Sequence, residues 1–208
     1  MSPVAPVSES EAVDKTAQTY GRIKEMLGSD TIPEPFLYYG RVPAFLQDFY
    51  MNVKKFVYTD GKLDAKLKAL IALCVARSMH CKMWIDPLTE RCKSLGYSDQ
   101  ELADALAIVS TCYMYNIFFK FRDIAGSDVF GGMSVGLRAH AFGNTSLDDK
   151  TVELINVVIS DINACKPCTS GHVTKARDLK IPDEAIQEAI QCAATIAAGC
   201  TFLNSVDE

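Results

Sequence analysis

Two cysteines in the last quarter of the chain are the residues whose chemistry is easiest to infer. Cys165 and Cys168 are separated by two residues, and His172 follows four positions after Cys168. If the pair begins a helix, all three side chains lie on one face, because residues three and four apart are neighbours on a helix. The N-terminal end of a helix stabilises a thiolate, which is the nucleophilic form of cysteine. Two thiols at this spacing can also close a disulfide, so they can take up and release electrons.

Glu153 is a candidate partner for His172, although it lies twelve residues before Cys165. In one straight helix those twelve residues would span about 18 Å. A break at 163–164 would instead make a helical hairpin in which Glu153 and His172 face each other at similar height. This geometry predicts a relay: Glu153 holds His172, and His172 takes the proton from Cys168, directly or through one water.

An internal repeat places these residues in the second of two copies. A shift of 84 positions aligns the segment from Leu63 with the segment from Leu147 without a gap, and pairs Cys81 with Cys165. The polar partners are missing from the first copy, where apolar residues stand at the positions of Cys168, His172 and Glu153: Trp84, Leu88 and Ala69, in that order. Because the three are lost together and present together, we infer that they act as a set in the second copy.

Helical periodicity, without strand-like alternation, predicts an all-α fold. Apolar residues recur three and four positions apart over residues 63–79 and again over 147–163, the long helices of the two copies. Ser146 is the expected N-cap of the second, with Asp149 at the third helical position as a variant of the capping box. Two shorter helices are expected before the repeat, over residues 16–27 and 43–57.

The same pattern divides the chain into four parts. The predicted domains are an N-terminal helical extension (1–62), a degenerate first copy (63–125), a linker (126–146) and an active second copy with the cysteine pair (147–208). Residues 1–15 are polar and contain two prolines, so we expect a frayed arm. The segment 32–35 also contains two prolines and is expected to be a loop. The linker is rich in glycine and should be irregular.

Composition limits the classes of function. With 208 residues and a net charge of −5, the chain shows no basic footprint for nucleic acid. Its N-terminus lacks the basic and apolar regions of a secretory signal, and no run reaches the roughly 18 apolar residues of a membrane span. We therefore expect a cytoplasmic protein with no nucleic-acid or membrane partner.

Most of the other apolar and aromatic side chains are expected to be structural. Four of the eight cysteines fall within apolar helical patterns and should pack in the core: Cys74, Cys112, Cys192 and Cys200. Four aromatic residues are expected in core or subunit contacts, with pocket lining as the alternative: Tyr113, Tyr115, Phe118 and Phe119.

The spacing of Glu153, Cys165, Cys168 and His172 resembles the motif of the alkyl hydroperoxidase D (AhpD)-like family, within the carboxymuconolactone decarboxylase superfamily. The resemblance covers about residues 63–206. It implies an all-helical fold of two tandem copies and a homo-oligomer, often a trimer. It also implies a disulfide reductase that draws electrons from protein-bound lipoamide and passes them to a peroxiredoxin, with weak direct reduction of hydroperoxides.

Carried over by position, the resemblance implies that Cys168 is the attacking thiol and Cys165 the resolving thiol, with Glu153 and His172 as the proton relay. No bound cofactor is expected, and the lipoamide of a partner protein is the expected electron donor. The best-known members of the family have a second histidine just before the second motif cysteine, where this chain has Pro167. That departure predicts weaker activation of Cys165 and leaves the identity of the reductant open.

The residues and the resemblance together leave three readings. The leading one is a thiol–disulfide antioxidant enzyme that reduces hydroperoxides or a partner peroxiredoxin. A non-catalytic redox sensor would form the same disulfide and turn over no substrate. In a zinc-binding interaction protein, the two cysteines with His172 and Glu153 would supply four ligands, and about one metal ion per chain should purify with the protein.

Overall fold

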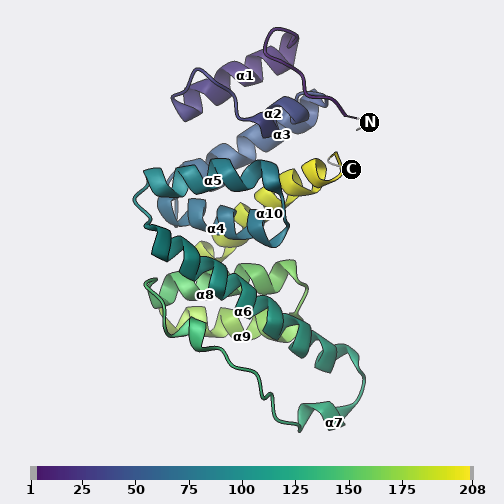
Figure 1. Ribbon diagram of the computed structural model, residues 1–208, viewed down its shortest axis with the longest axis vertical. Helices are drawn as coiled ribbons and strands as arrows, with labels where there is room; N and C mark the ends of the chain where they lie inside the picture. The colour runs from purple at the N-terminus through teal and green to yellow at the C-terminus, as the bar shows by residue number, and fades with distance from the viewer. Residues whose placement is uncertain (1–3, 207–208) are drawn as a thin grey trace. The chain divides into compact units, whose positions relative to one another are not determined.

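The computed structural model describes residues 4–206, and every regular element in that part of the chain is helical (Figure 1). The all-α prediction is therefore confirmed. The helices form two compact units, one from Met1–Cys92 with Gln191–Glu208 and the other from Lys93–Ile190. Helix α10 (Asp183–Asn204) begins in the second unit and ends in the first.

The first unit is built around an aromatic core. Its elements are α1 (Asp14–Leu27), α2 (Glu34–Tyr39), α3 (Pro43–Val53), a π-helical turn (Lys54–Tyr58), α4 (Ala65–Ser78), most of α5 (Lys82–Ser94) and the end of α10. Trp84 is fully buried, and its indole Nε1 donates a hydrogen bond to the Tyr39 hydroxyl over 2.8 Å. The rings of Phe36 and Phe49 lie 5.5 and 5.8 Å from that of Trp84. The first copy is therefore packed with aromatic rings at the position that Cys168 has in the second.

The loop predicted at 32–35 is only partly correct. Pro33 is the N-cap of α2, and Pro35 lies in its first turn. Proline is tolerated there because the first N–H groups of a helix have no partner within the helix. The two prolines thus begin a helix that the sequence reading excluded.

The expected frayed arm is attached to the first unit where the structure describes it. The Val7 N–H donates to the Leu37 carbonyl over 2.8 Å, and the Tyr20 hydroxyl donates to the Val7 carbonyl over 2.9 Å. Residues 1–3, the start of that arm, lie outside the described residues. The prediction of fraying is wrong from residue 4 onward, because these bonds hold an extended segment against α1 and α2.

The second unit contains the predicted helical hairpin. Its elements are α6 (Asp99–Ile124), α7 (Asp128–Gly131), a 3-10 turn (His140–Phe142), α8 (Asp149–Ile162), α9 (Lys166–Asp178) and the first turns of α10. Helices α8 and α9 pack against each other, and α6 packs on both. The chain breaks at Asn163 and Ala164, as predicted, and Ala164 has a left-handed φ of 51° that ends α8. The linker is irregular apart from α7 and the 3-10 turn.

The cap of α8 differs from the prediction. Asp148, not Ser146, is the N-cap, and its carboxylate accepts hydrogen bonds from the N–H groups of Lys150 and Thr151. The Ser146 N–H and hydroxyl instead donate to Asp104 of α6 over 2.6 and 2.7 Å. Asp148 is the N-cap because its carboxylate accepts hydrogen bonds from two N–H groups that have no partner within the helix, whereas Ser146, two residues earlier, bonds elsewhere.

The last helix of each sequence copy packs on the other copy: α6 of the first copy on the second, and α10 of the second copy on the first. In the second unit, Lys120 Nζ of α6 donates to the Asn163 carbonyl at the end of α8 over 3.0 Å. In the first unit, Asn204 Nδ2 of α10 donates to the Met79 carbonyl at the end of α4 over 2.8 Å. The two donors, Lys120 and Asn204, are 84 positions apart in the sequence, and so are the two acceptors, Met79 and Asn163. The sequence repeat therefore recurs as equivalent hydrogen bonds.

Two helices, α6 and α10, are long and apolar enough to cross a membrane, judged by length and composition alone. Their best windows reach a mean hydropathy of 1.4 and 1.2. The sequence prediction, which looked for a run of about 18 apolar residues, did not detect either helix. Half of the α10 window and a third of the α6 window are buried inside the structure. A buried core helix passes the same test, so this is weak evidence for a membrane.

Candidate active site

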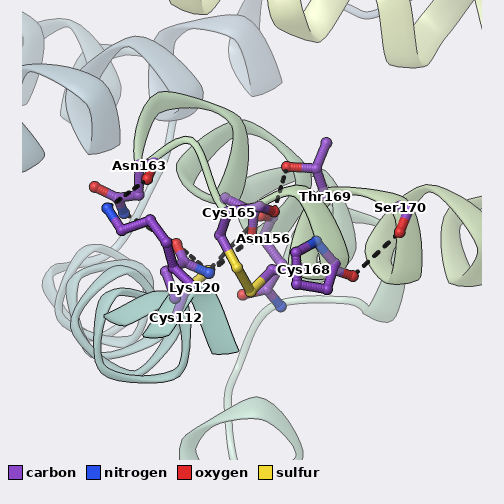
Figure 2. Close-up of a disulfide and its surroundings, with 11 residues drawn as sticks. Cys112, Lys120, Asn156, Asn163, Cys165, Cys168, Thr169 and Ser170 are labelled. Atoms are coloured by element: carbon purple, nitrogen blue, oxygen red, sulfur yellow. Dashed lines mark hydrogen bonds between the residues drawn. A yellow bond between two sulfur atoms is a disulfide. The ribbon is translucent and has the colours of Figure 1, made fainter. Parts of the chain in front are cut away.

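Cys165 and Cys168 lie at the N-terminal end of α9, as predicted, and a disulfide joins them in this structure (Figure 2). Cys165 is the N-cap residue, Cys168 lies in the first turn, and their Cα atoms are 5.3 Å apart. Cys165 is 0% exposed and Cys168 is 8% exposed. Cys168 is therefore the sulfur that a reagent from outside reaches first.

Local hydrogen bonds fix the turn that carries both sulfurs. Thr169 closes the first turn of α9, since its N–H and its hydroxyl both donate to the Cys165 carbonyl, over 2.9 and 3.1 Å. The Ser170 hydroxyl donates to the Pro167 carbonyl over 3.2 Å (Figure 2). Pro167 itself lies where a helix has no use for an N–H, so the proline fits the start of α9.

His172 Nδ1 is in hydrogen-bonding contact with Glu153 Oε1. The prediction that the hairpin brings these two residues face to face is confirmed. Their side chains are 14% and 10% exposed, so the pair is largely shielded from solvent. When Nδ1–H donates to the carboxylate, Nε2 keeps its lone pair and is free to accept a proton. The arrangement is that of a base whose orientation is set by a second side chain.

A cavity of about 400 Å³ opens beside Cys168 and His172. Aromatic side chains from α6 and the 3-10 turn form one wall: Tyr115, Phe119 and Phe142. Tyr115 and Phe119 thus line a pocket, which the sequence analysis gave as the alternative to a role in core or subunit contacts. Lys175 also lines the cavity, one helical turn beyond His172. Sequence reasoning missed Phe142 and Lys175, although Lys175 lies seven residues after Cys168 on the same helix.

A buried polar network connects α6 to the end of α8 close to the disulfide (Figure 2). Asn116 Nδ2 donates to the Ser160 hydroxyl over 3.0 Å and Asn163 Nδ2 donates to Asn116 Oδ1 over 2.9 Å. The Cys112 sulfur lies 3.4 Å from the Ser160 hydroxyl. Burial raises the pKa of the Cys112 thiol to about 11, so it stays protonated near neutral pH. Cys112 is a core residue, as expected, although it lies near the reactive pair.

No cluster of three or more histidine, cysteine, aspartate or glutamate side chains suited to a metal ion occurs within residues 4–206. The four ligands considered for zinc are arranged otherwise in this structure. Glu153 is bonded to His172, and the two sulfurs are bonded to each other. A four-ligand zinc site would require both of these bonds to open.

The sequence matches the carboxymuconolactone decarboxylase family over residues 43–116 and again over 130–207. The chain therefore belongs to that family. Each match covers most of one sequence copy, and the first begins at residue 43, within the segment predicted as an N-terminal extension.

Several relatives carry the name alkyl hydroperoxide reductase AhpD. The one from Streptomyces griseus is 25% identical over 76% of this chain and 88% of its own length. The one from Solibacter usitatus is 26% identical over 74% of this chain and 86% of its own length, and one from Methylobacterium is 30% identical over 52% and 62%. A solved structure described as a gamma-carboxymuconolactone decarboxylase subunit from Burkholderia xenovorans aligns with a TM-score of 0.60 over 93% of this chain and 97% of that one. At 16% identity, that likeness concerns the fold alone.

Proposed function

We propose that this protein is a thiol–disulfide antioxidant enzyme, an alkyl hydroperoxidase that reduces hydroperoxides or a partner peroxiredoxin through Cys165 and Cys168. One observation carries the proposal: Cys168 reaches a cavity that it shares with His172, while Cys165 is buried within bonding distance of it. The relatives named alkyl hydroperoxide reductase support a peroxide as the oxidant.

The chemistry follows from these positions. In the reduced protein, the Cys168 thiolate attacks the terminal oxygen of ROOH, so that an S–O bond forms and the O–O bond breaks. The alkoxide takes up the proton that His172 removed from Cys168 and leaves as ROH, with Glu153 holding the imidazole. Cys165 then attacks the sulfenic sulfur, the S–S bond forms, and hydroxide leaves with the Cys165 proton as water. One ROOH and two thiols thus give ROH, water and the disulfide.

A dithiol must return two electrons to this disulfide. We propose the dihydrolipoamide of a partner protein, on the strength of the motif resemblance, with attack at Cys168 because it is the more accessible sulfur. A cytoplasmic location belongs to the same proposal. The six other cysteines are buried and lie outside any disulfide, which suits a reducing compartment.

Turnover separates the three readings. Purified protein is supplied with dihydrolipoamide and an excess of cumene hydroperoxide, and both are followed with time. An enzyme consumes them one for one over many cycles, whereas a sensor consumes one equivalent of peroxide per chain and stops. Metal analysis of the same preparation addresses the third reading, since about one zinc per chain without peroxide consumption would favour the interaction protein.

The assembly state is a further part of the proposal. Helix α6 exposes apolar side chains along one face, each 49–73% exposed: Tyr113, Ile117, Phe121 and Ile124. Exposed apolar faces of this kind usually meet a partner. We propose that a second copy of this chain covers the face, in line with the homo-oligomer that the motif resemblance implies.

We expect the Ile117→Glu variant to sediment as a smaller species than the unmodified protein, because it places a charge in the covered apolar face. The matched control is Val13→Glu, at another exposed apolar residue, which should leave the size unchanged. Sedimentation velocity at micromolar concentration measures both. A monomeric unmodified protein, or an Ile117→Glu variant of unchanged size, would contradict this assembly.

A further inference from the structure

The cavity beside Cys168 has a wall that suits an apolar substrate. The rings of Tyr115 and Phe119 stack with centroids 5.9 Å apart, and Phe142 lies 6.2 Å from Tyr115. The Tyr115 hydroxyl donates to the Leu137 carbonyl over 3.0 Å, so its polar end is occupied within the protein. What this wall offers a ligand is therefore mainly ring surface, which favours hydrocarbon over a small polar peroxide.

One charged side chain lines the same cavity without a partner. The Lys175 ammonium forms no ion pair or hydrogen bond with any residue of the described chain, and the side chain is exposed. Asp149 and Asp178 share a neighbouring cavity with Lys175, and neither forms an ion pair with it. His172 is committed to Glu153, so Lys175 is the cation that remains available to an anion in the cavity beside Cys168.

The helix fixes the distance between the reactive sulfur and this cation. Cys168 and Lys175 lie seven residues apart on α9, which corresponds to about 10 Å along the axis. The two residues lie about two turns apart, and both line the cavity. A ligand whose peroxide group reaches Cys168 can therefore lie along the aromatic wall and place its other end near the Lys175 ammonium group.

We infer that this cavity selects hydroperoxides with an apolar body and a carboxylate about 10 Å from the peroxide oxygen, with Lys175 holding the carboxylate. Fatty-acid hydroperoxides oxidised in mid-chain have this form. The inference rests on the proposed function and narrows its substrate class. Lys175 takes no part in bond making: the peroxide is reduced by the two thiols as described above, and the carboxylate is unchanged.

The test compares an acid with its ester. The probes are the nine-hydroperoxide of linoleic acid, its methyl ester and cumene hydroperoxide, each assayed with dihydrolipoamide. We expect Lys175→Met to raise KM for the acid about fivefold, as for loss of an exposed ion pair, and to leave KM for the ester and for cumene hydroperoxide unchanged. The matched control is Lys150→Met, the same loss of charge on α8 at an exposed position that does not line the cavity.

The outcomes distinguish this inference from the function on which it rests. A preference of the unmodified protein for the acid, weakened by added salt and lost in Lys175→Met alone, supports it. Equal KM values for acid and ester, or an equal change in both with Lys175→Met, overturn the role of Lys175 and leave the peroxidase intact. If cumene hydroperoxide itself is not consumed, the proposed function and this inference both fail.

Discussion

The Cys168→Ser variant should lose peroxide reduction down to the uncatalysed background, a fall of more than about a thousandfold, because a serine hydroxyl cannot replace a thiolate as nucleophile. The measurement is hydroperoxide consumption with dihydrolipoamide in excess. Cys112→Ser is the matched control, since Cys112 lies near the disulfide and the pKa of its thiol is raised by burial. The serine hydroxyl of this variant can still form a hydrogen bond with the Ser160 hydroxyl. We expect this control to retain its activity.

A Cys165→Ser variant distinguishes the roles of the two thiols. In Cys165→Ser the first attack on peroxide remains possible, so one peroxide should be consumed and a sulfenic acid should accumulate on Cys168. A sulfenic-acid trap with peptide mapping detects it. A Cys168→Ser variant that turns over at the unmodified rate would contradict the assignment of Cys168 as the attacking thiol.

Glu153→Gln should lower kcat about a hundredfold, as expected for the loss of positioned acid–base catalysis. Glutamine keeps the shape of the side chain and can still accept a hydrogen bond from His172 Nδ1. It cannot stabilise the imidazolium that forms when His172 takes the Cys168 proton. Steady-state rates as a function of pH measure the loss, and thermal unfolding checks that the fold persists.

A double-mutant cycle provides the internal control for this relay. If Glu153 acts through His172, then Glu153→Gln adds little further loss in a His172→Gln background. Losses that multiply would show that the two residues act independently. An unchanged kcat and pH profile in Glu153→Gln would contradict the relay and reduce the buried pair to a structural contact.

The local part of this site could be predicted from the sequence. The placing of Cys165 and Cys168 at a helix start and the contact between Glu153 and His172 depend on helical spacing and on one chain reversal. Both are properties of neighbouring residues in a single hairpin. The fixed rise of a helix makes such distances predictable once the break is located.

The remaining features depend on contacts between distant segments. The repeat shift shows that two copies are similar, and it does not show that α6 packs on α8 of the other copy. Phe142 joins the cavity from a short turn in the irregular linker, where no periodicity marks it. The cap of α8 was misplaced because Asp104, 42 residues before Ser146, takes the hydrogen bonds that Ser146 would otherwise use locally.

The other cysteines allow the central claim to be tested on the native protein. All six are buried, and burial raises the pKa of the Cys92 thiol to about 12 and that of the Cys112 thiol to about 11. Burial likewise raises the pKa of Cys74. These thiols should therefore be silent towards a disulfide reagent in the folded, reduced protein. Cys168 should react with it first, and the buried Cys165 should then displace the reagent from Cys168 and close the disulfide, so that two equivalents of reagent thiol are released rapidly.

The most direct measurement is a native thiol titration before and after one equivalent of hydrogen peroxide, with peptide mapping of any bridge formed. We expect the loss of two rapidly reacting thiols per chain, mapped to a disulfide between Cys165 and Cys168. Persistence of both thiols after peroxide, or a bridge that joins other cysteines, would contradict a redox dithiol at the start of α9.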